Sequence, residues 1–330
     1  MQRTRRREFL FTAAALAAAP LARAQARRTF RIGFGYALLP EREALFRQLL
    51  AELGRTHGSD YVFVDSGLAF GADLDEAARR VVAREPDVIY VTDTAFALAV
   101  QKVTRTIPVV MYSSGYPVAA GVAQSLARPG GNVTGNTAYA GTGIWGKLFQ
   151  LLAEAKPGVK RVGLVWDYLP PIFAPAEIEF GMGELRAGAG SLGLALEFAE
   201  IRNQDEVPDA LARLVAQRVD ALLVTYGPVL RPEVSRVLRF AVAKRLPTIM
   251  DSHPITPHDP GPLLVYSASV ADLTRRSFAY IDRILRGEKA GDLPIQQPAR
   301  FELVVNLRTA TAIGLVLPQS ILARADKVIE

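Results

Sequence analysis

The sequence contains no cysteine, and this absence excludes disulfide bonds, thiol nucleophiles and cysteine-ligated metal sites. It also excludes a lipobox, the motif that directs lipid attachment to an N-terminal cysteine. The mature chain is therefore not expected to be anchored to a membrane.

Histidine is scarce, with three in the chain. His57 stands beside a glycine in a predicted surface loop. His253 and His258 lie near Asp251 and Asp259, but three prolines interrupt this stretch, so no regular element fixes the geometry that metal ligands need. A solvated loop is the preferred interpretation. Because no G-x-S-x-G motif or obvious nucleophile-base pair is present either, no catalytic residue and no metal site is expected.

A complete dinucleotide-binding fingerprint is also lacking. Gly33-Phe34-Gly35 follows a predicted strand, but Leu38 occupies the place of the third glycine of G-x-G-x-x-G. A tight turn explains the two glycines, and no cofactor is expected.

The excess of positive charge is small outside the N-terminus. Five arginines against one glutamate give residues 1–26 a charge of +4 out of the total of +6. The remainder is too weak to serve as an electrostatic footprint for nucleic acid.

Residues 1–26 have the layout of a cleaved signal peptide. A basic head precedes an apolar stretch, residues 9–21, and small-x-small patterns place cleavage near Ala24 or Ala26. The apolar stretch is too short to span a bilayer. Arg6 and Arg7, followed by Phe9 and Leu10, match the twin-arginine core, with an ordinary Sec signal as the alternative. Either route predicts a periplasmic location.

Strands and helices alternate through the first half of the chain. Residues 29–37, 61–67 and 87–93 are predicted strands, and apolar residues at helical spacing mark the segments between them. Residues 107–111 form another buried strand, which ends at Tyr112, Ser113 and Ser114. A Gly130-Gly131 turn follows, interpreted as a crossing between two lobes.

A second series of the same kind follows. Residues 161–167, 194–201, 221–227 and 247–252 are predicted strands, and residues 234–242 carry an apolar helical stripe. A further strand at residues 263–269 leads into a long helix. The chain is long enough for two domains. The predicted fold class is α/β, with two Rossmann-like lobes, each a parallel sheet covered by helices.

Two long motifs carry a resemblance to a known family. Tyr116-Pro117-Val118 and the run GVAQSLARPGGNVTG at residues 121–135 resemble D-P-V and G-L-V-x-S-L-A-R-P-G-G-N-V-T-G. Residues 292–318 resemble D-L-P-x-x-Q-P-x-x-F-x-L-x-x-N-x-x-T-A-x-x-L-G-L-x-x-P. These patterns belong to the periplasmic solute-binding proteins of ABC transporters, in the family that includes the tryptophan/tyrosine-type binding proteins.

The resemblance implies a type I periplasmic binding protein fold. Lobe 1 would comprise residues 27–136 and about 263–291, and lobe 2 residues 137–262 and about 292–330. Three crossings would form a hinge that closes the lobes around a ligand. The implied function is capture of a small organic solute, amino-acid-like or another small carboxylate or aromatic compound, for an inner-membrane ABC permease, with a monomeric protein.

Pocket positions depart from the family pattern. Asp93 and Ala95 replace a glycine and a proline, Tyr116 replaces an aspartate, and Asp167 and Tyr168 stand where an asparagine-proline pair is common. The scaffold motifs are kept, so the resemblance implies the fold and the transport role but not the ligand.

Polar and aromatic residues at predicted strand carboxyl ends are the candidate ligand site, since ligands of open α/β sheets bind there. An aspartate could hold an ammonium group, aromatic rings could stack on a ring, and helices beginning after Asp93 and Gly227 could direct N–H groups at a carboxylate. Asp93 could equally be a helix cap alone. The candidates are Tyr36, Asp93, Thr94, Ser113, Ser114 and Tyr116 from lobe 1, and Trp166, Asp167, Tyr168, Tyr226, Asp251 and Ser252 from lobe 2.

Two other functions remain open at this point. An exported sensory protein could bind the ligand and report to a membrane receptor, which a permease and ATPase encoded beside it would argue against. The other is an exported enzyme on the same fold, which a chromophore or metal bound to protein purified from its native export route would favour.

Overall fold

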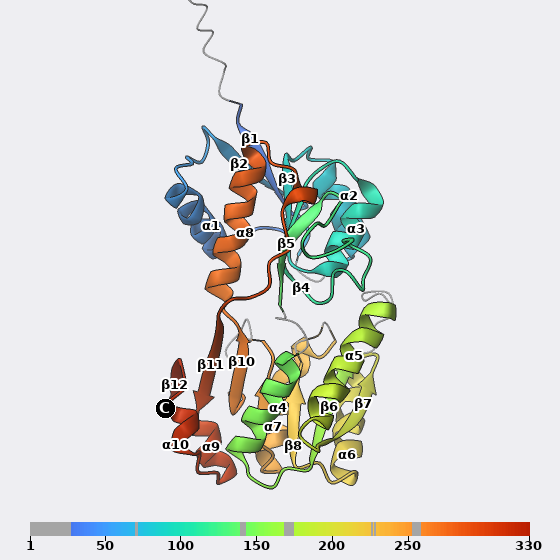
Figure 1. Ribbon diagram of the computed structural model, residues 1–330, viewed down its shortest axis with the longest axis vertical. Coiled ribbons are helices and arrows are strands. Elements are labelled where there is room, and N and C mark those ends of the chain that lie inside the picture. The colour runs from blue at the N-terminus through green and yellow to red at the C-terminus, as the bar shows by residue number, and fades with distance from the viewer. Residues whose placement is uncertain are drawn as a thin grey trace, which may run out of the picture.

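Short apolar strands build two sheets that lie end to end along the molecule (Figure 1). The computed structural model describes residues 28–69, 72–138, 143–167, 175–225, 227, 229–252 and 259–330. The predicted signal peptide and the loop with His253 and His258 lie outside the described residues. Within those ranges, no helix has the length and apolarity needed to cross a bilayer.

The first sheet is five-stranded and wholly parallel, in the order β2-β1-β3-β4-β5. The sequence prediction of a parallel sheet is confirmed for this lobe. The Gly130-Gly131 turn, however, is not the crossing between lobes, because the strand that follows it still pairs with β4. The strands are β1 (Phe30–Phe34), β2 (Tyr61–Asp65), β3 (Val88–Val91), β4 (Val109–Ser114) and β5 (Val133–Thr137).

Helices cover both faces of the first sheet, and its strands are therefore buried on both faces. Alternate residues of β3 belong to different cores: Val88 and Tyr90 pack with α1 (Pro40–Glu52) and α8 (Val270–Leu285). Ile89 and Val91 pack instead with α2 (Leu74–Val82) and α3 (Thr94–Val103). This period of two places successive side chains on opposite sides of the sheet.

The second sheet is seven-stranded and mixed, in the order β12-β11-β10-β9-β8-β6-β7. Only the β10–β11 pair among its described strands is antiparallel, since the chain returns into β11 from the other lobe. The strands are β6 (Arg161–Asp167), β7 (Ala195–Ile201), β8 (Ala221–Val224), β9 (Thr248–Met250), β10 (Leu264–Ala268), β11 (Phe301–Asn306) and β12 (Lys327–Ile329).

Helices also cover both faces of the second sheet. One face packs against α4 (Ile144–Ala155), α5 (Pro175–Gly190), α9 (Leu307–Ile313) and α10 (Gln319–Leu322). The other packs against α6 (Val207–Ala216) and α7 (Val234–Ala243). The type of fold expected from the sequence, two α/β lobes, is therefore confirmed.

Two segments lie in the opposite lobe from the one expected. The sequence predicts that the strand at residues 263–269 and the helix after it both belong to lobe 1. In the structure this strand is β10, which pairs with β9 and β11 in the second sheet. Only the helix, α8, returns to lobe 1. Conversely, Leu293 and Ile295 were assigned to lobe 2, yet both are buried in cores of lobe 1. Backbone pairing across the sheet and burial, which local patterns do not encode, decide both placements.

The crossings between lobes are therefore after β5, between β10 and α8, and before β11. Hydrogen bonds connect these crossings on the lobe 1 side. The Asn136 amide donates to the carbonyls of Tyr112 and Leu273, both at 3.2 Å, and to Ser277 Oγ at 2.9 Å. The Thr137 N–H donates to the Gln296 carbonyl at 2.8 Å. These bonds fix the ends of β4, β5 and α8 as one block.

We expect Gly135→Ala to destabilise the fold by about 3 kcal/mol or more, since a new methyl group would overpack the sheet in a strained backbone conformation. Gly135 has φ of +131° and a Cβ there would lie 2.2 Å from the Met111 carbonyl oxygen. Urea denaturation measures the change. Gly131→Ala is the control, because a Cβ at that position meets nothing within 4 Å; equal losses in both variants would contradict this explanation.

Candidate functional site

A cavity of about 350 Å³ lies between the two lobes. Its walls come from the carboxyl ends of β4 and β6, from the segments that follow β3, β4, β5, β8 and β9, and from α1, α4 and α5. The lining residues are Arg42, Thr92, Asp93, Ser113, Ser114, Gly115, Tyr116, Ala138, Trp145, Trp166, Asp167, Ile178, Gly181, Leu185, Thr225, Gly227, Arg231, Asp251 and Ser252.

Most of the candidate residues from the sequence line this cavity. They are Asp93, Ser113, Ser114, Tyr116, Trp166, Asp167, Asp251 and Ser252. Tyr36 and Thr94 are not among the lining residues. Tyr168 and Tyr226 lie outside the described residues. The structure thus brings the two sets of strand ends to one cavity, and ligand contact by these side chains stays a prediction.

Tyr36 and Thr94 do not line the cavity but contact segments next to its lining residues. The Tyr36 ring packs edge-on against Phe96 at 5.0 Å between centroids. Burial, followed by the Asp93 carboxylate, raises the pKa of Tyr36 to about 12, and the charge of Arg231 acts in the opposite direction. Thr94 is 2% exposed, and its hydroxyl accepts a hydrogen bond from the Gly115 N–H at 3.2 Å. Thr94 therefore fixes the loop that carries the neighbouring lining residue, Tyr116.

Asp93 both caps a helix and faces the cavity. One carboxylate oxygen accepts the Phe96 N–H at 2.9 Å at the start of α3, and the other accepts the Thr92 hydroxyl at 2.8 Å. The side chain is half-buried and remains part of the cavity wall. The two interpretations left open by the sequence are therefore compatible with each other.

Asp167, the last residue of β6, is the most deeply buried carboxylate of the cavity at 6% exposure. Its Oδ2 atom accepts the N–H groups of Val229 at 2.8 Å and Leu230 at 3.1 Å. Its buried Oδ1 atom has no hydrogen-bond partner among the described residues. Burial raises the pKa of Asp167, while the two N–H groups and the charge of Arg231 oppose that rise. Asp167 therefore brings a buried carboxylate to the cavity wall with one oxygen that has no partner among the described residues.

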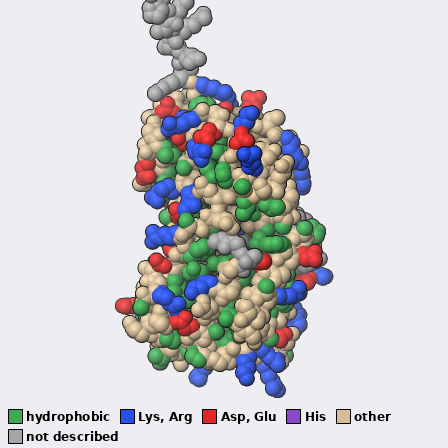
Figure 2. Space-filling view, in the orientation of Figure 1, with side chains coloured by type: hydrophobic (Ala, Val, Ile, Leu, Met, Phe, Trp, Pro, Cys, Tyr) green, Lys and Arg blue, Asp and Glu red, His purple; other side chains and the backbone are tan. Residues whose placement is uncertain are grey.

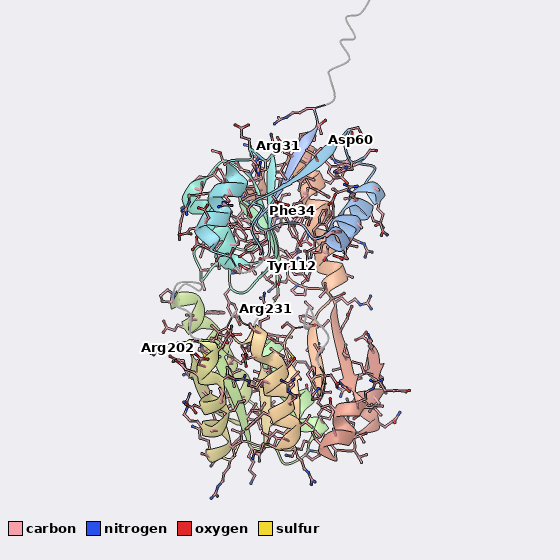
Figure 3. The ribbon with its side chains drawn as sticks, turned by 180° about the vertical axis from the view of Figure 1, so that it is seen from behind. Arg31, Phe34, Asp60, Tyr112, Arg202 and Arg231 are labelled. Atoms are coloured by element: carbon pink, nitrogen blue, oxygen red, sulfur yellow. The ribbon has the colours of Figure 1, made fainter. Side chains whose placement is uncertain are left out.

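Two arginines that the sequence analysis did not select add positive charge to the cavity. Arg42 comes from the first turn of α1, and Arg231 begins a 3-10 turn, Arg231–Glu233, ahead of α7. Figure 3 shows Arg231 and Tyr112 at the facing edges of the two lobes. Burial raises the pKa of Tyr112, and the positive charge of Arg42 opposes that rise.

Neither arginine directly follows a strand, so a search of strand ends passes over both. The helix expected directly after Gly227 does not begin there, because the first helical turn starts at Arg231. The sequence signal that could have identified Arg231 is a positively charged residue in the first turn of a helical segment that follows a strand.

One end of the cavity is apolar and is made by helices of the second lobe. Trp145 of α4 and Ile178, Gly181 and Leu185 of α5 form this end, with Tyr116 of the first lobe against them. In the sequence, Trp145 marked only the buried face of a helix, and most of its surface is indeed in the core, at 3% exposure. Figure 2 shows hydrophobic side chains gathered on the visible face where the two lobes meet.

The arrangement suits a small solute that carries charges of both signs and an apolar group. Guanidinium groups can bind a carboxylate, an unpartnered carboxylate oxygen can accept an ammonium, and the apolar end can exclude water from a side chain. No group of three or more His, Asp or Glu side chains in the described parts of the chain could hold a metal ion.

Comparison with known proteins gives a consistent picture. A model of the ABC transporter substrate binding protein family matches residues 46–329. The chain is 24% identical over 238 residues to the tyrosine-binding protein of Clostridioides difficile strain R20291, a match that covers 72% of this chain but just under two thirds, 66%, of that protein.

Solved structures show the same fold. The ABC domain from Streptococcus pneumonia in complex with L-Trp has a TM-score of 0.77 at 21% identity, over 92% of this chain and all of that one. A conserved domain protein from Vibrio cholerae also has a TM-score of 0.77, at 23% identity, over 91% of this chain and all of that one.

Gly227→Ala should disrupt the site, because a Cβ at this position would lie 2.2 Å from Asp167 Oδ2. The carboxylate would have to leave the N–H groups of Val229 and Leu230, at a cost of about 1–3 kcal/mol. Thermal denaturation measures the loss. Gly190→Ala, where a Cβ meets nothing within 4 Å, is the control. If Gly227→Ala were as stable as that control, Asp167 would not need the close approach of a glycine.

Proposed function

Because the chain belongs to the ABC transporter substrate binding protein family, we propose that it is the periplasmic substrate-binding component of an ABC importer. It captures a small amino-acid-like solute between its lobes and delivers it to an inner-membrane permease. One observation carries this proposal: a single cavity is lined by strand carboxyl ends of both sheets and contains charges of both signs.

The proposed ligand is a zwitterionic amino acid with an apolar or aromatic side chain. Arg231 and Arg42 supply guanidinium groups for its carboxylate, and the negative charge of Asp167 at the cavity wall attracts its ammonium. The apolar end around Trp145 and Leu185 receives the side chain. The tyrosine-binding relative and the L-Trp complex support this class of ligand.

The proposed mechanism is closure of the lobes around the ligand. Lobe 1 supplies Arg42 and Asp93, and lobe 2 supplies Asp167 and Arg231, so one ligand reaches all four only when the lobes are together. Contacts made only in that state shift the equilibrium between open and closed forms. A micromolar affinity would correspond to about −8 kcal/mol. The permease then recognises the two lobe rims at the spacing that closure creates.

Binding without chemical conversion accounts for the site as it stands. The site contains a carboxylate in a helix cap, a carboxylate held by two backbone N–H groups, and an apolar helix face. These groups are suited to holding a solute. Export through the predicted signal peptide would place the protein beside its permease.

We expect a thermal-shift screen of residues 25–330 to find stabilisation by one class of amino acid. At one hundred times its dissociation constant a ligand adds about 2.7 kcal/mol, which raises the midpoint by about 4 °C in a protein of this size. Sugars, purines and dicarboxylates are the comparison sets. A response to metals or nucleotides, with none to amino acids, would reject amino-acid capture and favour an exported enzyme.

Asp167→Asn should separate stability from binding. Since burial raises the pKa of Asp167, the folded protein binds more protons than the unfolded chain between the two pKa values. The contribution of this carboxyl to the free energy of unfolding therefore falls as the pH rises through that interval and stays low at neutral pH. The ligand-free variant should thus melt higher than wild type at pH 7, and the difference should shrink with falling pH and disappear only below the pKa of the unfolded carboxyl, about 3.8.

The same variant tests the ammonium contact. The asparagine side chain keeps the shape of Asp167 but removes its charge, so affinity for phenylalanine or tyrosine should fall about tenfold or more. Isothermal titration calorimetry measures this loss, with 3-phenylpropionate, which has no amino group, as the matched ligand. An equal loss for both ligands would show that Asp167 does not pair with the amino group.

A further inference from the structure

Tyr116 belongs to lobe 1 and is held there by its backbone. Its neighbour Gly115 donates an N–H to Thr94 Oγ1 at 3.2 Å, and the Tyr116 carbonyl accepts the Ala120 N–H at 2.9 Å. Ala120 is part of a lobe 1 core. The loop is thus fixed to the first lobe at both ends of this residue.

The Tyr116 side chain, in contrast, contacts lobe 2. Its hydroxyl accepts the indole N–H of Trp145 from α4 at 3.0 Å. Its ring packs edge-on against Phe180 of α5, with 4.8 Å between the centroids. Both partners are on helices that cover the second sheet. One residue of lobe 1 therefore makes a hydrogen bond and a ring contact across the lobes.

A glycine on α5 makes room for this contact. A Cβ at Gly181 would lie 3.0 Å from Tyr116 Cε2, closer than ordinary van der Waals contact. On the same helix, a Cβ at Gly183 meets nothing within 4 Å. The smallest residue thus stands at the position of α5 that faces the tyrosine ring.

None of these contacts involves a ligand atom, so they can form in the ligand-free protein. We propose that Tyr116 is a positioning residue that joins the two lobes before the solute arrives, so that part of the ligand-free population is already closed. This inference deepens the proposed function and rests on it for its effect on binding, although closure itself does not require a ligand.

The consequence for binding is specific. When the closed form is the binding-competent one, the apparent dissociation constant equals the intrinsic constant divided by the closed fraction. A residue that changes only the closed fraction must change the affinity of every ligand by the same factor. A residue that touches the solute would instead change affinities according to the solute's shape.

The first measurement is the distance between lobes without ligand. Because the chain has no cysteine, Val103→Cys on α3 and Val215→Cys on α6, both partly exposed, allow spin labels to be placed one in each lobe. Wild type should show a short-distance, closed population. Tyr116→Phe should lower the ratio of closed to open forms about fivefold or more, since the buried indole N–H of Trp145 loses its Tyr116 acceptor while the ring stays.

Matched variants separate closure from local stability. Gly181→Ala should also reduce the closed population, whereas Gly183→Ala, which equally adds an alanine to α5, should not. Val118→Ala, at an exposed position on the Tyr116 loop, should leave the distances unchanged. A wild-type protein that is wholly open without ligand, or a Tyr116→Phe variant with unchanged distances, would overturn the proposal.

The second measurement is affinity for at least three amino acids that bind wild type. Tyr116→Phe should weaken all of them by one common factor, no larger than the measured fall in the ratio of closed to open forms. Losses that differ among ligands would show a direct contact and reject the positioning role. If no solute binds, the proposed function fails, and the distance measurement still decides whether Tyr116 joins the lobes.

Discussion

The cavity depends on the way three chain crossings hold two sheets end to end. In a parallel sheet the loops after the strands are all at one edge, and here the edges of both sheets face each other. Asn136 connects β4, β5 and α8 beside those crossings, while the Thr137 N–H bonds to Gln296. Because this block belongs to one lobe, all three crossings leave lobe 1 from one fixed region.

Charge burial is the second feature that shapes the molecule. Asp167 has one oxygen held by two backbone N–H groups and another with no partner among the described residues. An ionised carboxylate in this position costs folding free energy, which the extensive cores of the second lobe can offset. Charged groups that are buried at such a cost are found more often at functional sites than elsewhere.

At two positions beside the cavity, a glycine leaves room for the close approach of a side chain from another segment. Gly227 lets Asp167 reach its N–H donors, and Gly181 lets Tyr116 lie against α5. At both positions the contact is between segments far apart in the sequence. The family model matches most of the chain, residues 46–329, while such local approaches contribute to the shape of the cavity.

The sequence alone determined the two-lobed α/β fold and eight of the lining residues, because strand and helix periods and strand carboxyl ends are local properties. It also supplied the Asp93 cap. It did not place β10 and Leu293 in their lobes, since backbone pairing and burial link residues distant in the chain. Nor did it indicate Arg42 or Arg231, which enter the cavity from helical turns, or the bond from Trp145 to Tyr116. Only the tertiary structure decided these, because the packing of one lobe against the other sets which helix faces reach the cavity.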